Sequence, residues 1–290
     1  MYRIAKNIML ITSPTNPRIN KLKDLHTTRG RKKHGLFLME GPHLLEALLD
    51  ANVLPNEVYY HTEYLQRTIK GSVLLARLLL MPDLIDEQRV EVSERVIEAI
   101  SDTVTSQGVV SVLPLTAFLP DAVRARRLHH TITQRPALLI LDAIADPGNM
   151  GTMLRTALAA DVDTVLLTPN CVDCYSPKVV RAAAGVHIFL PIENSVSWPT
   201  IAASIRAHCH DNIRVLLAEA GSAILYYEQD LTQPFALIIG NEAHGPSPEA
   251  RALATTSVTI PLANDVESLN AAMAAGIVLY EAVRQKLKRG

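Results

Sequence analysis

From Ala137 to the C-terminus, short apolar runs alternate with segments of helical spacing, and this alternation constrains the fold more than any other feature. The apolar runs are, in order, ALLILDAI, TVLLT, HIFLPI, IRVLLAEA, FALIIG and VTIPL. The helical segments between them include GNMGTMLRTALAA, SPKVVRAAAG, a stretch within 198–208, PSPEARALA and a long final helix over 266–287. Strands that are apolar on both faces and alternate with helices are typical of a parallel sheet covered on both sides. The sequence therefore predicts an α/β domain with a parallel sheet over 137–290.

Polar or glycine-containing loops follow four of these strands, and ligands of such sheets bind beyond the carboxyl ends of the strands. The loops are 145–151, 168–176, 240–246 and 261–268. The third, GNEAHGP, holds more polar and conformationally special residues than a turn requires. The fourth leads into the final helix and places Ser268 and Asn270 in its first turns, where they can be ordinary helix caps. Two such loops close together in sequence favour a shared pocket.

The N-terminal part of the chain is predicted to be a smaller α/β unit. LFLMEG, VLPNEVYYHT and GVVSVLPL are typical of strands, and PHLLEALLDA and residues 64–79 are typical of helices. Residues 118–136 lack strand periodicity, contain prolines and arginines, and suit a linker. We therefore expect domains at 1–117 and 137–290, which agrees with about 150 residues per domain in a chain of 290.

The formal net charge of −1 argues against a nucleic-acid partner, but this total averages two unlike parts. Residues 1–35 hold nine basic side chains and one acid, about +8, whereas the remaining 19 basic and 28 acidic side chains give about −9. Asn16 to Leu25 are predicted to form a capped helix, and Thr27 to Gly35 a turn-rich basic loop. We expect RNA phosphate contacts from these segments and from the SPKVVRAAAG helix, at Arg18, Lys21, Arg29, Arg31, Lys32, Lys33, Lys178 and Arg181.

Several other classes of protein are disfavoured. No apolar run approaches the roughly 18 residues of a spanning helix, and MYRIAKNIML lacks the pattern of a secretory signal. Three cysteines in a chain of this length do not make a disulfide framework, so we expect a cytoplasmic protein. Cys171 and Cys174 have CxxC spacing, but a second cysteine pair is absent and we expect no metal site. The dinucleotide-binding fingerprint is also absent, which disfavours a nucleotide-dependent oxidoreductase.

Four blocks of the sequence carry a specific resemblance. DPGNMGTMLRTA, SPKVVRAAAG, LIIGNEAHG and IPLANDVESLNAAMAAGIVLYE resemble, in order and spacing, the signature motifs of the SpoU-type RNA 2′-O-methyltransferases of the SPOUT superfamily. NPRINKLKDLHTTRGRKKHGLFLMEGPHLLEAL is similar to the ribosomal-protein-like substrate-binding domain that many members carry. The resemblance implies a C-terminal deep trefoil knot, an exception to the rule that chains do not thread loops. It also implies S-adenosylmethionine as cofactor and a homodimer formed through the C-terminal domain.

The resemblance implies roles for individual residues. Arg155 matches the arginine thought to activate the ribose 2′-hydroxyl, and Asn149, Glu242, Ser268 and Asn270 match the polar residues around it. Cofactor-binding positions are implied at Leu167, Thr168, Gly240, Asn241, Ile260, Leu262, Ser268 and Leu269. Two roles for Arg155 stay open, because an arginine is almost always protonated. It either becomes transiently neutral, or it orients the hydroxyl and stabilises the developing oxyanion while a substrate phosphate or water takes the proton.

The substrate implied by the resemblance is large-subunit ribosomal RNA, because the appended domain is typical of those members. Transfer RNA is the alternative substrate. A non-catalytic RNA-binding or ribosome-assembly factor on the same fold is the alternative class, and the presence of Arg155, Asn149, Glu242, Ser268 and Asn270 disfavours it.

Overall fold

The computed structural model describes residues 9–125, 137–209 and 213–289. The chain divides into two compact units. The N-terminal unit comprises the residues up to Phe118 together with Tyr175–Arg181, and the C-terminal unit comprises Leu119–Cys174 and the residues from Ala182 onward. The segment Tyr175–Arg181 thus joins the N-terminal unit, although the sequence assigned it to the C-terminal domain. Each unit is described below by itself.

The N-terminal unit is built on a mixed five-stranded sheet with the order β1-β4-β3-β5-β2. Its strands are β1 (Met9–Ile11), β2 (Leu36–Glu40), β3 (Glu57–Tyr60), β4 (Arg89–Val92) and β5 (Val109–Pro114). β5 is antiparallel to both β2 and β3, whereas β1, β4 and β3 are mutually parallel. The starts of β2, β3 and β4 therefore lie at the same edge of the sheet as the end of β5, an arrangement that matters for a hollow described below.

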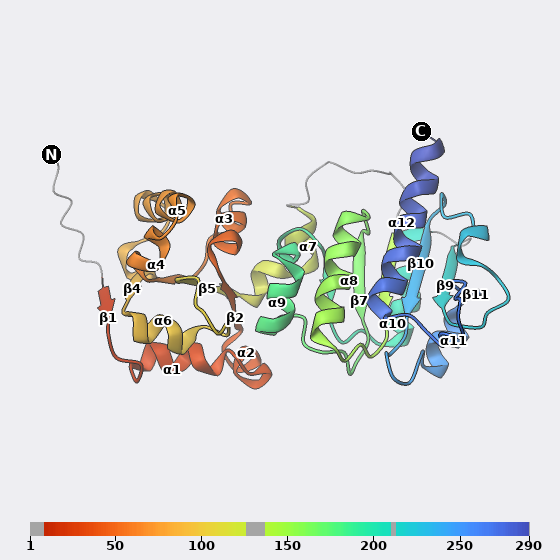
Figure 1. The fold of residues 1–290 in the computed structure, drawn as a ribbon, viewed down its shortest axis with the longest axis horizontal. Helices are drawn as coiled ribbons and strands as arrows, with labels where there is room; N and C mark the ends of the chain where they lie inside the picture. The colour runs from red at the N-terminus through yellow and green to blue at the C-terminus, as the bar shows by residue number, and fades with distance from the viewer. Residues whose placement is uncertain (1–8, 126–136, 210–212, 290) are drawn as a thin grey trace. The chain divides into compact units, whose positions relative to one another are not determined.

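Helices of the N-terminal unit surround this sheet (Figure 1). They include α1 (Pro17–Asp24), α2 (Thr28–His34), α3 (Pro42–Asp50), α4 (Thr62–Gln66), α5 (Ile69–Leu80) and α6 (Glu94–Ile100). Asn16 caps α1 through its side-chain oxygen, and Pro17 occupies the first helical position, as the sequence predicted. The single helix predicted over 64–79 is wrong, because α4 ends at Gln66 and Thr68 caps α5 by accepting from the backbone amide of Gly71.

The basic loop predicted for 27–35 is also wrong, because most of it is helix α2. The Thr27 side chain accepts a hydrogen bond from the Gly30 amide at the start of the helix. Gly35 ends the helix in the left-handed conformation with φ of 65°, which glycine adopts at little cost. Two local caps therefore make a helix of a segment whose composition is typical of a turn.

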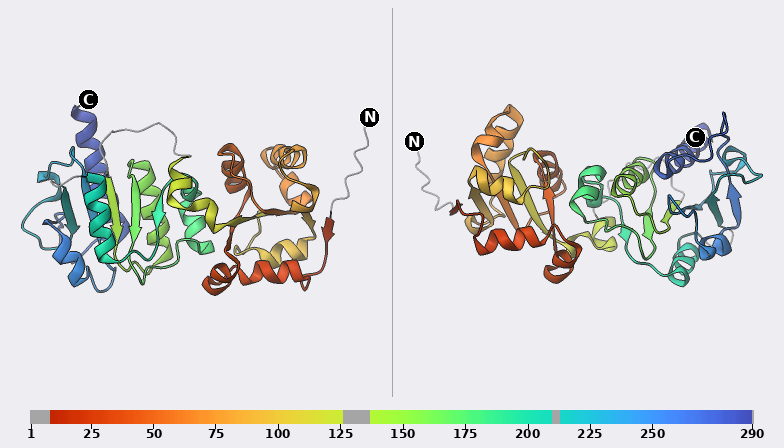
Figure 2. Two further views of the ribbon diagram at one scale, coloured as in Figure 1. Left: turned by 180° about the vertical axis from the view of Figure 1, so that it is seen from behind. Right: turned by 60° about the horizontal axis from the view of Figure 1, so that its bottom comes forward.

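The C-terminal unit contains an all-parallel sheet of six strands with the order β11-β9-β10-β6-β7-β8 (Figure 2). The strands are β6 (Ala137–Leu141), β7 (Thr164–Leu167), β8 (Ile192–Glu193), β9 (Arg214–Ala218), β10 (Phe235–Ile239) and β11 (Thr256–Val258). β6, β7 and β10 are buried along their whole length, which explains their apolar composition on both faces. After β6 the chain continues on one side of the strand and later returns to the other, so the topological switch lies between β6 and β10.

Helices cover this sheet, and α8 and α12 lie side by side (Figure 1). The helices of this unit are α7 (Pro120–Arg124), α8 (Pro147–Ala159), α10 (Trp198–Cys209), α11 (Pro248–Leu253) and α12 (Ala271–Arg289). Most of α9 (Pro177–Ala183) belongs to the segment Tyr175–Arg181, which groups with the N-terminal unit. The predicted strand HIFLPI begins within a 3-10 turn, Val186–Ile188, and only its last residue, Ile192, belongs to a strand. Of the predicted strand VTIPL, only Val258 lies in β11. No helix in the described ranges is long and apolar enough to span a membrane. The trefoil knot implied by the resemblance stays a prediction.

The predicted start of the last helix is wrong as well. The helix begins at Ala271 rather than at 266, and the ten residues before it, 261–270, are all exposed. Asn264 and Asp265 have positive φ angles, so the loop turns sharply there. Ser268 and Asn270 therefore belong to an exposed loop, and Asn270 alone is in position to cap the helix.

Candidate active site

A pocket of about 580 Å³ opens beside the carboxyl ends of β9, β10 and β11, next to the topological switch of the parallel sheet. Its lining includes Asn149, Glu219, Ile239, Gly240, Asn241, Glu242, Thr259, Ile260, Leu262, Ser268, Leu269 and Asn270. Loops after three neighbouring strands and the start of α12 thus contribute to one site. This is the place where parallel sheets bind ligands, and the volume suits a ligand of cofactor size.

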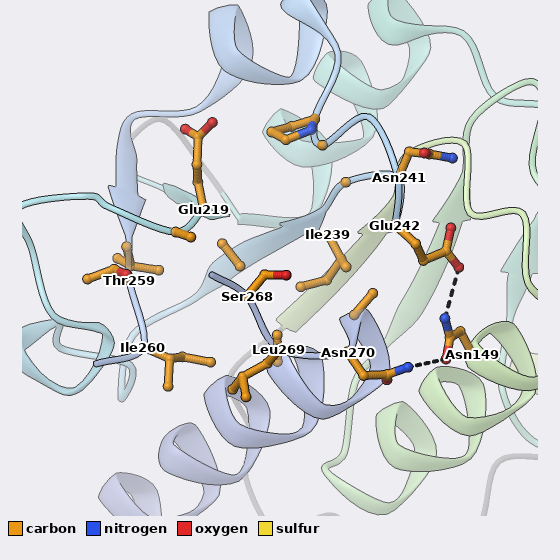
Figure 3. A pocket seen from close by; sticks show the side chains of 18 of the residues that line it. Asn149, Glu219, Ile239, Asn241, Glu242, Thr259, Ile260, Ser268, Leu269 and Asn270 are labelled. Carbon is orange, nitrogen blue, oxygen red and sulfur yellow. Dashed lines mark hydrogen bonds between the residues drawn. The ribbon is translucent and has the colours of Figure 1, made fainter. Parts of the chain in front are cut away.

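A chain of hydrogen bonds runs along one end of this pocket (Figure 3). Asn270 Nδ2 donates to Asn149 Oδ1 at 2.8 Å, and Asn149 Nδ2 donates to Glu242 Oε1 at 3.0 Å. Backbone amides complete the chain at both ends. The amides of Ala145 and Asp146 donate to the Glu242 carboxylate, and those of Ala272 and Met273 donate to Asn270 Oδ1.

The chemistry of the two ends fixes the direction of this chain. Glu242 can only accept when ionised, so Asn149 must turn its nitrogen toward the carboxylate and its oxygen toward Asn270. Asn270 then presents its nitrogen to Asn149, because its oxygen accepts from the first amides of α12. Each of the two carboxamide nitrogens uses one hydrogen in the chain and keeps a second. Both therefore hold a spare donor at the pocket, suited to an oxygen that gains negative charge.

Glu242 is held as a carboxylate. Burial alone would raise its pKa, but the hydrogen bonds from Asn149 and from the amides of Ala145 and Asp146 bring the pKa below its ordinary value. An ionised carboxylate that already accepts three hydrogen bonds is a weak proton acceptor at neutral pH. Glu242 is therefore suited to orienting Asn149 rather than to removing a proton.

The loop after β10 is braced against the loop after β6. Asn241 Nδ2 donates to Ala143 O at 2.7 Å, and Asn241 Oδ1 accepts from the amides of Ala243 and His244. Asp142, which is 4% exposed, accepts from the amide of Ser247 at 2.7 Å. The Asn241 side chain thus shapes the pocket wall by holding two loops together, and this uses its oxygen and one of its two Nδ2 hydrogens.

The structure does not bring Leu167 and Thr168 into this pocket. Both are buried at the end of β7, which lies on the side of β6 away from β10. The Thr168 hydroxyl donates to Asp142 Oδ1 and accepts from the Ala143 amide, so it anchors the loop after β6. Thr168 thus supports the pocket indirectly, and the predicted cofactor contact at these two residues stays a prediction.

Gly240 is needed where β10 ends. A Cβ atom placed there would lie 2.4 Å from the backbone nitrogen of Pro246, closer than real side chains approach. The chain therefore folds back on itself next to the pocket only because this residue has no side chain. Ile260, Leu262 and Leu269 supply the apolar part of the lining, and Leu262 and Leu269 are 37% exposed.

The sequence reasoning missed Glu219, which lines the other end of the pocket from Asn149 (Figure 3). Glu219 follows β9, and its carboxylate accepts from Arg251 on α11, whose guanidinium also donates to Pro246 O. The loop after β9 begins with a charged residue, and charged residues also occur in the other candidate loops. This charged residue was visible in the sequence, but periodicity did not show that β9 lies beside β10, and so Glu219 could not be placed at the pocket.

Arg155 lies outside the pocket, on the exposed surface of α8. Six residues separate it from Asn149, which is one and two-thirds helical turns at about 3.6 residues per turn, so the two side chains leave the helix in different directions. Within the described ranges, the Arg155 guanidinium has no hydrogen bond or ion pair to another residue.

The predicted RNA-binding residues differ in their surroundings. Arg31 is 2% exposed and donates to Leu25 O and Thr28 Oγ1, so it stabilises the N-terminal unit from inside. Arg18 pairs with Glu57 at 2.8 Å, and Arg181 pairs with Asp102. The remaining five predicted residues are exposed, namely Lys21, Arg29, Lys32, Lys33 and Lys178. The basic surface of α1 and α2 is therefore smaller than their composition suggested.

Cys171 and Cys174 bond to separate partners. Cys171 Sγ donates to Leu141 O, and the buried Cys174 contacts the Asn194 carboxamide. Burial raises the pKa of Cys171, and it raises that of Cys174 to about 12. In the ranges that the structure covers, no group of three or more His, Cys, Asp or Glu is placed to hold a metal ion.

Comparison with known proteins identifies the family. Residues 136–280 match the SpoU rRNA methylase family, and residues 16–111 match an MRM3-like substrate binding domain. An uncharacterized tRNA/rRNA methyltransferase of Synechocystis is 35% identical over 99% of this chain and 97% of its own length. The 23S rRNA (guanosine(2553)-2′-O)-methyltransferase RlmP of Bacillus subtilis is 30% identical over 93% of this chain and 97% of its own length. The chain belongs to the SpoU rRNA methylase family.

A solved structure supports the same assignment. The AdoMet-bound rRNA methyltransferase from Sinorhizobium meliloti is 27% identical and covers 96% of this chain and 98% of its own, with a TM-score of 0.76. The protein is therefore an S-adenosylmethionine-dependent RNA methyltransferase of the SpoU family. The pocket described above, with apolar walls, a close backbone turn at Gly240 and a carboxylate at Glu219, fits such a cofactor.

Proposed function

We propose that this protein methylates a ribose 2′-hydroxyl of large-subunit ribosomal RNA, and that the pocket beside β10 binds the cofactor. The observation that carries the assignment of the site is the hydrogen-bonded chain from Asn270 through Asn149 to Glu242, with two spare amide hydrogens at the pocket. The choice of ribosomal RNA is supported by the match to a substrate-binding domain and by the 23S rRNA methyltransferase activity for which the Bacillus subtilis relative is named. We also propose a cytoplasmic location, on the composition of the chain alone.

The pocket residues divide the work of holding the cofactor. Ile260, Leu262 and Leu269 offer apolar surface for a nucleobase, and Glu219 offers a carboxylate for hydroxyl or ammonium groups. When bound, S-adenosylmethionine supplies an electrophilic methyl group on a sulfonium. The backbone turn at Gly240 and the brace through Asn241 keep the wall of this pocket in place.

The spare hydrogens of Asn149 and Asn270 are placed to act on the ribose oxygen. Transfer of a methyl group requires the nucleophile in line with the leaving group, so positioning supplies much of the rate. Two carboxamide donors can orient the 2′-oxygen and stabilise the negative charge that grows on it. Ser268 lies in the loop before α12 and also lines the pocket (Figure 3). We infer that its hydroxyl is a third group that can form a hydrogen bond with the 2′-oxygen.

The proton of the 2′-hydroxyl needs an acceptor other than Glu242, for the reasons given above. Two roles of Arg155, on the exposed surface of α8, remain as alternatives. Either it becomes transiently neutral and takes the proton itself, or it orients the hydroxyl while a substrate phosphate or water takes the proton. A pH–rate profile of Arg155→Lys separates these roles. Full activity at all pH values would remove any special role of the guanidinium, whereas activity recovered only at high pH would support proton transfer.

The substrate is tested by methylation. Purified protein is incubated with labelled S-adenosylmethionine and with transcripts of large-subunit ribosomal RNA or of transfer RNA, and 2′-O-methyl sites are mapped. We expect one site in ribosomal RNA. Methylation of transfer RNA alone would overturn the choice of substrate. Absence of cofactor binding, with and without RNA, would favour the non-catalytic alternative.

We also propose that the protein is a homodimer through α12 and the loop before it. Met273, Tyr280 and Leu287 are 59%, 50% and 65% exposed and recur every seven residues, so they form one apolar stripe along the helix. Val266 on the preceding loop is also exposed. A second copy would cover this surface. Sedimentation analysis should show a dimer for the wild type and a monomer for Tyr280→Asp combined with Leu287→Asp.

A further inference from the structure

A second hollow, of about 300 Å³, lies in the N-terminal unit, where α1 crosses one end of the mixed sheet. Buried leucine and valine side chains, Leu22, Leu36 and Val112, form its floor. Lys21, Asn56, Glu57 and Gln88 form its rim, at the starts of β3 and β4 and on α1. None of the residues proposed above to hold the cofactor belongs to this hollow.

Several polar groups on the rim have hydrogen-bond donors or acceptors that are not used within the described structure. Within the described ranges, neither Lys21 Nζ nor the Asn56 carboxamide has a hydrogen-bond partner, although the Asn56 backbone is fixed by donating to Val112 O at 2.8 Å. Gln88 Oε1 accepts from the Ile85 amide at 2.9 Å, which leaves its Nε2 hydrogens unused. The backbone is thus anchored, while the polar side-chain atoms are available to a ligand.

The charge of the hollow favours an anionic ligand. The Glu57 carboxylate is already neutralised, because one oxygen pairs with Arg18 at 2.8 Å and the other accepts from the Tyr59 hydroxyl at 2.6 Å. Lys21 is left as an uncompensated positive charge. Two carboxamides and one ammonium group, arranged around the buried apolar side chains of the floor, match the hydrogen-bonding edge of a nucleobase and a phosphate.

From this juxtaposition we infer that the hollow binds one unpaired nucleotide of the RNA substrate. Its volume is at the lower end of the range for ligand sites, enough for a single nucleotide rather than a larger cofactor. Proteins read single-stranded RNA by placing splayed bases on apolar surfaces and bonding their edges. The inference rests on the proposed function, since it assigns a specific recognition task to the substrate-binding unit.

The test uses the full chain and the four nucleoside 5′-monophosphates as probes. We expect one of them to shift the side-chain amide NMR signals of Asn56 and Gln88 in the wild type. Its affinity, measured by calorimetric titration, should fall about tenfold or more in Asn56→Ala combined with Gln88→Ala. Asn20→Ala combined with Gln66→Ala is the matched control, since it removes the same two side-chain types from exposed positions outside the hollow. Asn56→Asp, which keeps the side-chain shape, should weaken binding as well.

A competition experiment separates an RNA site from a free-nucleotide site. A transcript of large-subunit ribosomal RNA should displace the bound mononucleotide, and it should do so less well in the Asn56 and Gln88 variants. The inference is overturned if no monophosphate shifts these signals, or if one binds and RNA does not displace it. Methylation of ribosomal RNA by the wild type is scored separately, so failure of the hollow and failure of the proposed function give different results.

Discussion

The two units of the chain each form a hollow at the end of a sheet, but the hollows differ in whether their polar side chains are already hydrogen-bonded to other residues. In the C-terminal unit, Asn270, Asn149 and Glu242 are tied to one another and to backbone amides before any ligand binds. In the N-terminal unit, Asn56 and Lys21 have no such partners in the described structure. Preorganised donors suit the stabilisation of charge in a reaction, whereas available donors suit binding. The difference indicates that chemistry and recognition are divided between the units.

The sharpest way to break this comparison is to add one negative charge to the hydrogen-bonded chain of the C-terminal unit. Asn149→Asp places a second carboxylate where Asn149 Nδ2 now lies 3.0 Å from Glu242 Oε1. Two carboxylates at that distance repel unless they share a proton, so the chain breaks and its donors are lost. We expect kcat to fall by about 100-fold or more, with a smaller change in cofactor affinity.

A second substitution checks the cause of that loss. Asn149→Asp combined with Glu242→Gln exchanges the charged and neutral partners, so the carboxamide introduced at position 242 can donate to the carboxylate introduced at position 149. Asn270 can still donate to residue 149 in this double variant. We therefore expect at least tenfold recovery of kcat over Asn149→Asp alone. Losses that simply add would show that the hydrogen-bonded chain has no part in the reaction.

A pair of glycine substitutions tests how rigid the pocket wall is. Gly240→Ala brings a methyl group against the backbone of Pro246, so the turn beside the pocket must open. We expect cofactor affinity to fall about tenfold or more by calorimetric titration. Gly276→Ala is the control, because its nearest atom, Thr156 Cγ2, is 3.8 Å away and alanine favours a helix by about 0.5–1 kcal/mol. Equal effects of both substitutions would contradict a special role for Gly240.

Much of this organisation could be predicted from the sequence, and the failures have identifiable causes. Apolar runs located the strands, and the resemblance gathered Asn149, Glu242 and Asn270 into one group. Strand order is set by tertiary packing, so periodicity did not show that β9 neighbours β10 or that Thr168 lies on the far side of β6. It could also not show which way each carboxamide points, because that depends on a carboxylate and a helix end brought together by the fold.

Local caps caused the other errors. The segment 27–35 looked like a loop because Thr27 and Gly35 are typical turn residues, yet in the structure they begin and end a helix. Arg31 was grouped with its exposed neighbours, although its guanidinium satisfies a carbonyl inside the unit. The sequence shows which side chains are basic but not which of them the helix turns inward.

Acid should weaken the C-terminal unit through His187. Burial lowers the pKa of His187 to about 4, despite the hydrogen bond with Cys174 O. An unfolded chain takes up this proton near pH 6.5, so between about pH 6.5 and 4 protonation favours unfolding and stability falls as pH falls. The expected loss is up to about 3 kcal/mol, since one pKa unit corresponds to about 1.4 kcal/mol.

Trp198, the only tryptophan, lies in the C-terminal unit, so its fluorescence during denaturation reports on that unit. His187→Gln should be less stable at neutral pH but lose less stability on acidification than the wild type. His43→Gln is the control, because the His43 side chain is 92% exposed in the N-terminal unit. An unchanged acid slope in His187→Gln would show that other groups cause the loss.

The smallest effect is expected from the exposed basic residues of α2, and it tests whether recognition resides in the N-terminal unit. Replacing Arg29, Lys32 and Lys33 together by alanine removes three exposed charges, which should lower RNA affinity about tenfold at moderate salt. The slope of log affinity against log salt should become shallower by about 0.7–0.9 per lost phosphate contact.

Arg31→Ala should instead lower the free energy of unfolding by about 1–3 kcal/mol, because it leaves the Leu25 carbonyl without its buried donor. The matched control for the triple variant of α2 is the replacement of Arg67, Lys70 and Arg95 by alanine, because these are three exposed cations elsewhere on the same unit. If both triple variants lowered RNA affinity equally, binding would depend on total charge, and recognition could not be assigned to α2.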